Sequence, residues 1–226
     1  MAEQHNNSSV FVKDIIIGMS DGLTVPFALT AGLSGVVSTN HLIIISGIAE
    51  ITAGCISMGL GGFLAGETEV DHYNAELKKE YTEIETVPHL ELKEVEDALA
   101  EMGVESDLSK KVALQISRNK DNWANFMMQA ELKLEKPSKN RARQSAVTIA
   151  VSYLVGGLIP LFPYIITNTN KSGLYLSCTV TIIALLFFGY FKSKVTEQPL
   201  IKGTLKVASI GIVAAAAAYL LAKAVS

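Results

Sequence analysis

Five long apolar runs, separated by polar segments, restrict the possible folds of this chain more than any other feature. Each run approaches the roughly 20 residues that an α-helix needs to cross the hydrocarbon core of a bilayer. The first run begins too late, and is followed too soon by the second, to be a cleaved signal peptide. The sequence therefore gives five candidate membrane spans. They are Ile15–Val37, Leu42–Ala65, Ala146–Ile166, Leu174–Phe191 and Val207–Val225.

The charged residues are concentrated between the second and third runs. Of the 22 acidic residues, 17 fall between Glu67 and Glu135, and 12 of the 19 basic residues fall between Lys78 and Arg143. Because the rest of the chain is nearly uncharged, this pattern indicates membrane segments interrupted by one polar insert. The two cysteines lie inside apolar runs, which argues against a disulfide framework.

The positive charges that flank the runs predict an orientation. Lysine or arginine precedes the first and third runs and fills the loop between the fourth and fifth, whereas the turn "STNH" between the first and second has neither. Positive residues remain on the cytosolic side of a membrane. We therefore expect the N-terminus, the insert and the fourth loop to be cytosolic, and the C-terminus to face the opposite side.

The first run contains a carboxylate and a proline, Asp21 and Pro26. Proline cannot donate a hydrogen bond to the carbonyl four residues back, which leaves the Gly22 carbonyl free beside Asp21. An ionised Asp near the bilayer centre costs about 2.5–3.5 kcal/mol on insertion scales. We interpret Asp21 as a ligand or proton carrier on a cation route. The alternative is a structural kink in which Asp21 bonds to another helix.

The second run has a stripe of residues at four-residue spacing, Ser46, Glu50, Gly54, Met58 and Gly62. Such spacing places them on one face of a helix. Small residues in a stripe are typical of helix packing, but packing does not require Glu50. A carboxylate together with a thioether suits a softer transition metal, because Mg²⁺ and Ca²⁺ gain nothing from sulfur.

The polar insert has the pattern of amphipathic helices. No Gly or Pro follows Gly66 until Pro88, so the second spanning helix is expected to continue as one long helix. Gly103 is predicted to cap the next helix, and Ser106 or Asp107 to be the N-cap of the one after it.

Acidic residues and methionines recur in the insert at helical spacing. Like charges one turn apart destabilise an isolated helix, so a bound cation would stabilise it, although a solvated acidic face is the alternative. The carboxylate–thioether pairing of the second run appears again here, which suggests that a metal passes from the insert to the membrane part. The positions are Glu69, Glu76, Glu80 and Glu83 on one face, Glu91 and Glu94 on a second, and Met127, Met128 and Glu131 near the end of the insert.

Two other functions account for part of the pattern. "EVDH", ending at His72, has the E-x-x-H spacing of di-iron helix bundles, which would fit a membrane-anchored iron oxidase. Such sites need two of these motifs, and the sequence contains one. A membrane metal sensor without transport is the second alternative, but it gives Asp21 and Glu50 no reason to lie in a bilayer.

Four segments resemble the vacuolar iron transporter family, over nearly the whole chain after the first ten residues. They are "DIIIGMSDGLTVPFALTAGLSG", "GIAEITAGCISMGLGGFLAGETEVDHY", "FMMQAELKLEKP" and "SAVTIAVSYLVGGLIPL". The resemblance implies an all-α integral membrane protein with five transmembrane helices and a cytosolic helical metal-binding domain between helices two and three. It further implies a homodimer whose protomers together form the path, and exchange of H⁺ for Fe²⁺.

The same resemblance implies site residues, boundaries and location. No enzymatic activity, resident cofactor or nucleic-acid partner is expected, and the sequence does not separate Fe²⁺ from Mn²⁺, Co²⁺ or Zn²⁺ as cargo. The membrane would be vacuolar in a eukaryote and the plasma membrane in a bacterium. The expected domains are a cytosolic tail (1–14), helices one and two (15–66), the metal-binding domain (67–140) and helices three to five (141–226). By motif, the pathway residues are Asp21, Glu50 and Met58, and the metal ligands are Glu80, Glu83, Glu91, Glu94, Met127 and Glu131, with Met128 adjacent.

Overall fold

The structure is a computed structural model that describes the backbone of residues 2–225 and the side chains of residues 10–225. In this part of the chain the regular elements are eight α-helices, with no strand. The chain divides into two compact units. We call the part up to Leu64 together with the part from Ala142 the membrane unit, and Ala65–Arg141 the insert unit.

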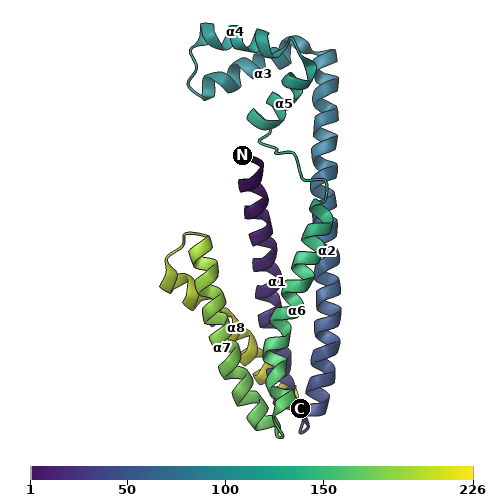
Figure 1. The fold of residues 1–226 in the computed structure, drawn as a ribbon, viewed down its shortest axis with the longest axis vertical. Coiled ribbons are helices and arrows are strands. Elements are labelled where there is room, and N and C mark those ends of the chain that lie inside the picture. The colour runs from purple at the N-terminus through teal and green to yellow at the C-terminus, as the bar shows by residue number, and fades with distance from the viewer. Residues whose placement is uncertain (1, 226) are drawn as a thin grey trace. The chain divides into compact units, whose positions relative to one another are not determined.

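The membrane unit contains the five long apolar helices shown in Figure 1. All five are long and apolar enough to cross a membrane, which confirms the five candidate spans in length and composition. Each helix extends beyond its apolar run, because the flanking polar residues also form helix. The five are α1 (Ala2–Ser34), α2 (Asn40–Thr86, whose first part belongs here), α6 (Arg141–Ile166), α7 (Asn170–Val195) and α8 (Leu200–Val225).

Helix α1 begins well before the apolar run. The sequence suggested a polar tail over residues 1–14, whereas the helix already starts at Ala2. No Gly or Pro occurs before Gly18, so nothing in this segment interrupts a helix. Met1 and the side chains of residues 1–9, His5 among them, lie outside the described residues.

Glycines allow α1 and α2 to approach α6 closely. A Cβ atom added at Gly22 of α1 would overlap the Tyr153 carbonyl oxygen of α6. One added at Gly54 of α2 would overlap the Tyr153 phenol. In a bilayer, helices associate through such van der Waals contact between small residues, because lipid is as apolar as the side chains. One residue of α6 therefore fills space left by glycines on two neighbouring helices.

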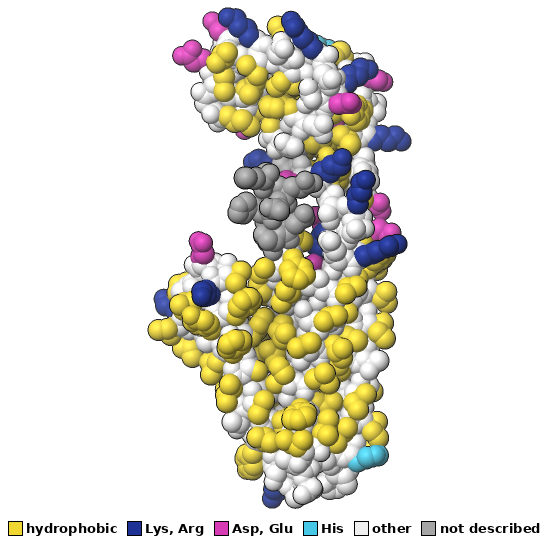
Figure 2. Space-filling view, viewed as in Figure 1, with side chains coloured by type: hydrophobic (Ala, Val, Ile, Leu, Met, Phe, Trp, Pro, Cys, Tyr) yellow, Lys and Arg dark blue, Asp and Glu magenta, His cyan; other side chains and the backbone are white. Residues whose placement is uncertain are grey.

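Large apolar side chains cover the outer surface of the membrane unit (Figure 2). Phe187 is 74% exposed, Leu221 67% and Val213 66%. Continuous apolar surface of this extent is rare on soluble monomers and marks a membrane or protein interface. The exposed side chains thus agree with the length and hydropathy of the helices.

The insert unit is a small helical bundle with its own core. Besides the end of α2, it contains α3 (Pro88–Glu101), α4 (Ser106–Ile116) and α5 (Lys120–Ala130). The expected continuation of α2 is confirmed, since it is one helix to Thr86, and Pro88 then occupies the first turn of α3. The buried core consists of Ile84, Val95, Leu99, Ala113, Trp123, Ala124 and Met127.

At the boundary between α3 and α4, the predicted end of the first helix is confirmed, but the predicted N-cap of the second is wrong. Gly103 has φ +88°, the left-handed backbone expected where a helix ends, and it follows the C-cap Met102. The predicted N-cap at Ser106 or Asp107 is wrong. Glu105 is the N-cap, with extended backbone, and its carbonyl accepts a hydrogen bond from the Ser109 amide at 2.8 Å. No side chain caps this helix, so the preference of Ser and Asp for the position did not apply.

Candidate functional site

Glu50 is a half-buried carboxylate in the apolar part of α2. The Tyr153 hydroxyl of α6 donates a hydrogen bond to its Oε1 atom. The other oxygen, Oε2, is buried and has no hydrogen-bond partner among the described residues. A buried acceptor without a donor is costly unless a proton or cation occupies it. One oxygen of Glu50 is therefore oriented by Tyr153, and the other can bind a proton or a metal ion.

Asp21 is the second predicted pathway carboxylate and lies on α1. Its side chain is half-buried, and its charge is close enough to act on the Tyr153 phenol. The next residue, Gly22, contacts the Tyr153 backbone. Among the described residues no hydrogen bond joins Asp21 to Glu50. The helices that carry the two predicted pathway carboxylates, α1 and α2, both pack against α6 at Tyr153. Tyr153 is a site residue that the sequence analysis missed.

Pro26 is buried and lies inside α1, which continues as helix to Ser34. Gly157 of α6 leaves room for its ring, because a Cβ atom there would come within 3.1 Å of the Pro26 Cγ atom. The predicted role of Pro26, freeing the Gly22 carbonyl beside Asp21, stays a prediction. What the structure adds is a packing role for the proline against α6.

The stripe of small residues on α2 faces α6. Gly54 contacts Tyr153, and a Cβ atom at Gly62 would meet the side chains of Ile149 and Ser145. Met58 lies between these glycines along the helix and is half-buried. The stripe is thus a helix-packing face, as its small residues suggested, and the same face also carries the candidate ligand Glu50.

A second group of carboxylates lies in the insert unit, on the last part of α2 and the start of α3. Oxygen atoms of Glu80, Glu83 and Glu91 all lie within 4.8 Å of one another. Glu80 and Glu91 are each only 3% exposed, and each has one buried oxygen without a hydrogen-bond partner among the described residues. Among the described residues, the Lys79 Nζ atom forms an ion pair with Glu83 of this cluster at 3.7 Å. Three clustered oxygens with so little positive charge nearby fit a divalent cation.

Two more of the predicted ligands belong to the same electrostatic group. Burial, and then the charges of Glu91, Glu131 and Glu83, raise the pKa of Glu80 to about 7. Burial, and then the charges of Glu94, Glu83 and Glu131, raise the pKa of Glu91 to about 7. Burial also raises the pKa of Glu131, followed by Glu94 and Glu83. Each of the five predicted glutamates is therefore close enough to interact electrostatically with at least one of the others.

Met127 and Met128 of α5 are fully buried. Met127 packs in the apolar core beside Trp123 and Ala124, and this packing is sufficient to account for it. Its ligand role, and that of Met128, stay predictions. His72 is exposed, and among the described residues the close carboxylate group contains no histidine. The E-x-x-H spacing therefore does not bring its histidine to this cluster.

The raised pKa values predict how the metal-free insert unit responds to pH. Glu80 and Glu91 have a pKa of about 7 when folded, against an ordinary value of 4.5, so the folded state holds protons that the unfolded state releases. Their stabilising effect is complete below pH 4.5 and is lost as the pH rises through 7. We expect a lower unfolding midpoint at pH 8 than at pH 5, read from the fluorescence of Trp123, the only tryptophan and a core residue of this unit.

Metal should reverse this loss, since ligating carboxylates must be deprotonated. At pH 8, Mn²⁺ at about 100 times its Kd should add about 2.7 kcal/mol. Glu80→Gln/Glu91→Gln is the control, and it should flatten the pH dependence and remove the effect of Mn²⁺. A midpoint that rises between pH 5 and pH 8 in the metal-free native protein would contradict the assignment.

Five apolar helices with carboxylates held among them define the class: a multi-pass helical membrane protein with sites suited to cations. Among such proteins, the chain belongs to the VIT family, whose model matches residues 12–223. It is 48% identical to Vacuolar iron transporter 1 of Oryza sativa subsp. japonica, over 99% of this chain and 88% of the relative. It is 47% identical to Vacuolar iron transporter 1 of Arabidopsis thaliana, over 99% and 89%. Protein CCC1 of Saccharomyces cerevisiae is 39% identical over 94% of this chain and 68% of its own length. Vacuolar iron transporters are transporters by name, not enzymes.

Proposed function

We propose that this protein is a proton-coupled antiporter that moves Fe²⁺ out of the cytosol into a vacuole. The names of its relatives support iron as the cargo and the vacuolar membrane as the location. The observation that carries the proton coupling is the state of Glu50, with one oxygen bonded to Tyr153 and the other buried without a partner. The N-terminus and the insert are assigned to the cytosol by the distribution of positive charge.

Coupling follows from competition for the same oxygen atoms. A ligating carboxylate must be deprotonated, so a site can hold a proton or a metal ion but not both. In this proposal, Fe²⁺ arriving at Glu50 and Asp21 displaces protons, and protons from the acidic side displace the metal. Met58 supplies a softer ligand two turns along α2, a donor that transition metals can use and Mg²⁺ does not favour.

The insert unit captures the metal before it enters the membrane. Its carboxylate cluster would hold Fe²⁺, or Mn²⁺, between the end of α2 and the first turn of α3, with Glu80, Glu83 and Glu91 as the central ligands. Glu94 and Glu131 add negative charge to the same group. In this proposal the cluster is the metal site of the domain predicted over residues 67–140.

We further propose that the protein acts as a homodimer. The apolar part of α2 exposes a row of large side chains, among them Ile45, Ile48, Ile56 and Leu60, each more than half exposed. A second copy covering this row would bring two sets of pathway carboxylates together. Native mass spectrometry of the full chain should give a mass of two protomers, and a monomer at all concentrations would contradict the proposal.

Loss of the Tyr153 hydroxyl should weaken transport without removing it. Removal of a hydrogen-bond partner that orients a metal ligand typically costs about 10–100-fold in affinity or activity. We expect Tyr153→Phe to lower Fe²⁺ uptake into proteoliposomes by this factor. Tyr164→Phe is the matched control, because its hydroxyl also lies on α6 but bonds to Ser34 at 2.8 Å, not to a carboxylate. Equal activity of Tyr153→Phe and native protein would exclude an orienting role.

Flux through sealed proteoliposomes, with and without a pH gradient, tests the function itself. Antiport predicts Fe²⁺ accumulation that depends on an acidic interior and that acidifies the outer solution as metal enters. An oxidase would consume oxygen with Fe²⁺ and move no metal, and a sensor would bind without flux. Absence of iron movement under any gradient would reject the proposal.

A further inference from the structure

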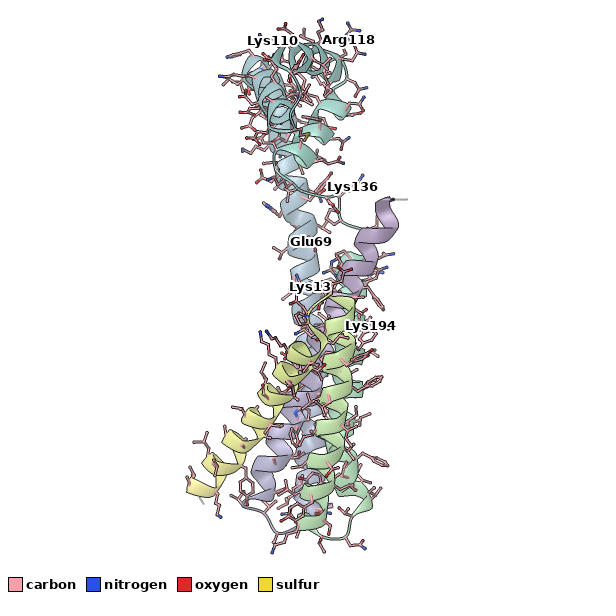
Figure 3. The ribbon with its side chains drawn as sticks, turned by 90° about the vertical axis from the view of Figure 1, so that its left-hand side faces the viewer. Lys13, Glu69, Lys110, Arg118, Lys136 and Lys194 are labelled. Atoms are coloured by element: carbon pink, nitrogen blue, oxygen red, sulfur yellow. The ribbon has the colours of Figure 1, made fainter. Side chains whose placement is uncertain are left out.

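Two adjoining hollows open at the end of the membrane unit where α7 meets α8. The first, of about 600 Å³, lies between α1 and α7 and is lined by Lys13, Ile16, Ile17 and Lys192 among others. The second, of about 360 Å³, lies between α7 and α8 and includes Lys202 and Lys206. Lys192 and Thr196 line both hollows, so the two hollows are neighbours along α7. Figure 3 shows Lys13 and Lys194 at this same end of the unit.

Among the residues whose side chains are described, the lining of both hollows contains lysines and no carboxylate. No described carboxylate forms an ion pair with Lys13, Lys192, Lys202 or Lys206. The nearest acids in sequence, Asp14 and Glu197, do not line either hollow. Four lysines around two neighbouring hollows repel one another unless an anion lies between them. The geometry therefore favours a negatively charged ligand.

The start of α8 adds to the positive electrostatic potential of the lysines. Lys202 and Gly203 of its first turn line the second hollow, as does Pro199 just before the helix, and this turn contains no acidic residue. The first amide groups of a helix have no partner inside the helix and carry partial positive charge, so they bind phosphate readily. Lysine side chains and helix amides together provide both charge and hydrogen-bond donors for a phosphate.

The apolar lining of the first hollow indicates which kind of phosphate. Val12, Ile16, Ile17 and Val195 surround the space next to Lys13 and Lys192, at the point where the apolar run of α1 begins. A soluble anion gains nothing from these side chains, whereas an acyl chain does. Lysines at the membrane boundary attract anionic lipid headgroups, and basic pockets between spanning helices bind them.

We propose that this site binds the phosphate group of an anionic phospholipid, with an acyl chain against α1 and the headgroup between Lys192 and Lys202. The lipid would connect α1, which carries Asp21, to α7 and α8. None of these lysines belongs to the proposed transport path or metal cluster. The lipid site and the antiport mechanism can therefore fail independently of each other.

Native mass spectrometry of the full chain in detergent tests the lipid site. We expect phosphatidylglycerol to bind in preference to phosphatidylcholine, and Lys192→Gln/Lys202→Gln to weaken phosphatidylglycerol binding about 30-fold, at roughly fivefold per lysine. Lys192→Arg/Lys202→Arg keeps the charge and should bind within about threefold of native protein. Lys110→Gln/Lys111→Gln is the matched control, because it removes two exposed lysines of the insert unit and should leave lipid binding unchanged.

Two results would overturn the proposal. One is equal binding of phosphatidylcholine and phosphatidylglycerol by native protein, a comparison that does not require any variant to fold. The other is a rise in unfolding midpoint with inorganic phosphate alone that is lost in Lys192→Gln/Lys202→Gln while phosphatidylglycerol has no effect. That second result would identify a soluble phosphate as the ligand.

Discussion

Glu50→Gln is expected to abolish Fe²⁺ uptake driven by a pH gradient in proteoliposomes. Glutamine has the size of glutamate, and its amide oxygen can still accept the hydrogen bond that the Tyr153 hydroxyl donates to Glu50. The packing of α2 on α6 should therefore persist. The amide, however, cannot ionise, so it neither neutralises the metal charge nor exchanges a proton. The loss should exceed the roughly 10–100-fold that removal of an outer hydrogen-bond partner costs.

The control for this variant is the same substitution at Glu197, an exposed acid between α7 and α8. Glu197→Gln should transport at the native rate. If Glu50→Gln also kept native uptake with native pH dependence, Glu50 would not be the coupling residue. Metal-dependent uptake that persisted but no longer responded to pH would assign the proton to Glu50 and leave the metal route intact.

The second large effect concerns the insert unit, where Glu80→Ala/Glu91→Ala should remove high-affinity metal binding. The two residues are two of the three carboxylates proposed as central ligands, and they are the most buried of the three. We expect Mn²⁺ affinity, measured by calorimetry on the full chain, to fall roughly 100-fold or more. The metal-free variant should nevertheless unfold at a higher temperature than native protein at pH 8, because the repulsion between the two carboxylates is gone.

The effect of Glu80→Ala/Glu91→Ala on Fe²⁺ uptake should depend on the iron concentration. If the cluster captures metal for the membrane path, the double variant loses uptake at low iron and regains most of it at saturating iron. Glu67→Ala/Glu101→Ala, which removes two exposed acids outside the cluster, should behave as native. Unchanged Mn²⁺ affinity in Glu80→Ala/Glu91→Ala would place the metal elsewhere in the chain.

Local signals in the sequence were sufficient for the helices but not for every boundary. The apolar runs gave the five spans because length and hydropathy are properties of one segment at a time. The absence of Gly and Pro between Gly66 and Pro88 likewise gave the uninterrupted α2. The start of α4 was misplaced because its N-cap, Glu105, uses its backbone alone, and a rule based on side-chain capping cannot detect that.

The candidate site was predictable only where one helix supplies it. Glu80 and Glu83 share a helix, so their common face could be read from their spacing. The approach of Glu91 from α3 depends on how α3 packs, and spacing within one segment contains no such information. Tyr153 was missed for the same reason. Nothing within its apolar run distinguishes it, and the available clue was indirect: Gly22 and Gly54 each allow another helix to approach closely.

The contact of both glycines with a single tyrosine also bears on how natural variation should be interpreted. A methyl group at Gly22 would overlap the Tyr153 backbone, and one at Gly54 would overlap the Tyr153 ring, whose hydroxyl orients Glu50. Neither glycine carries any charge. In a random mutagenesis screen for iron tolerance, loss-of-function substitutions should therefore occur at these two glycines about as often as at the acidic pathway residues. Alleles of this kind would be mistaken for folding defects unless the tyrosine between them were considered.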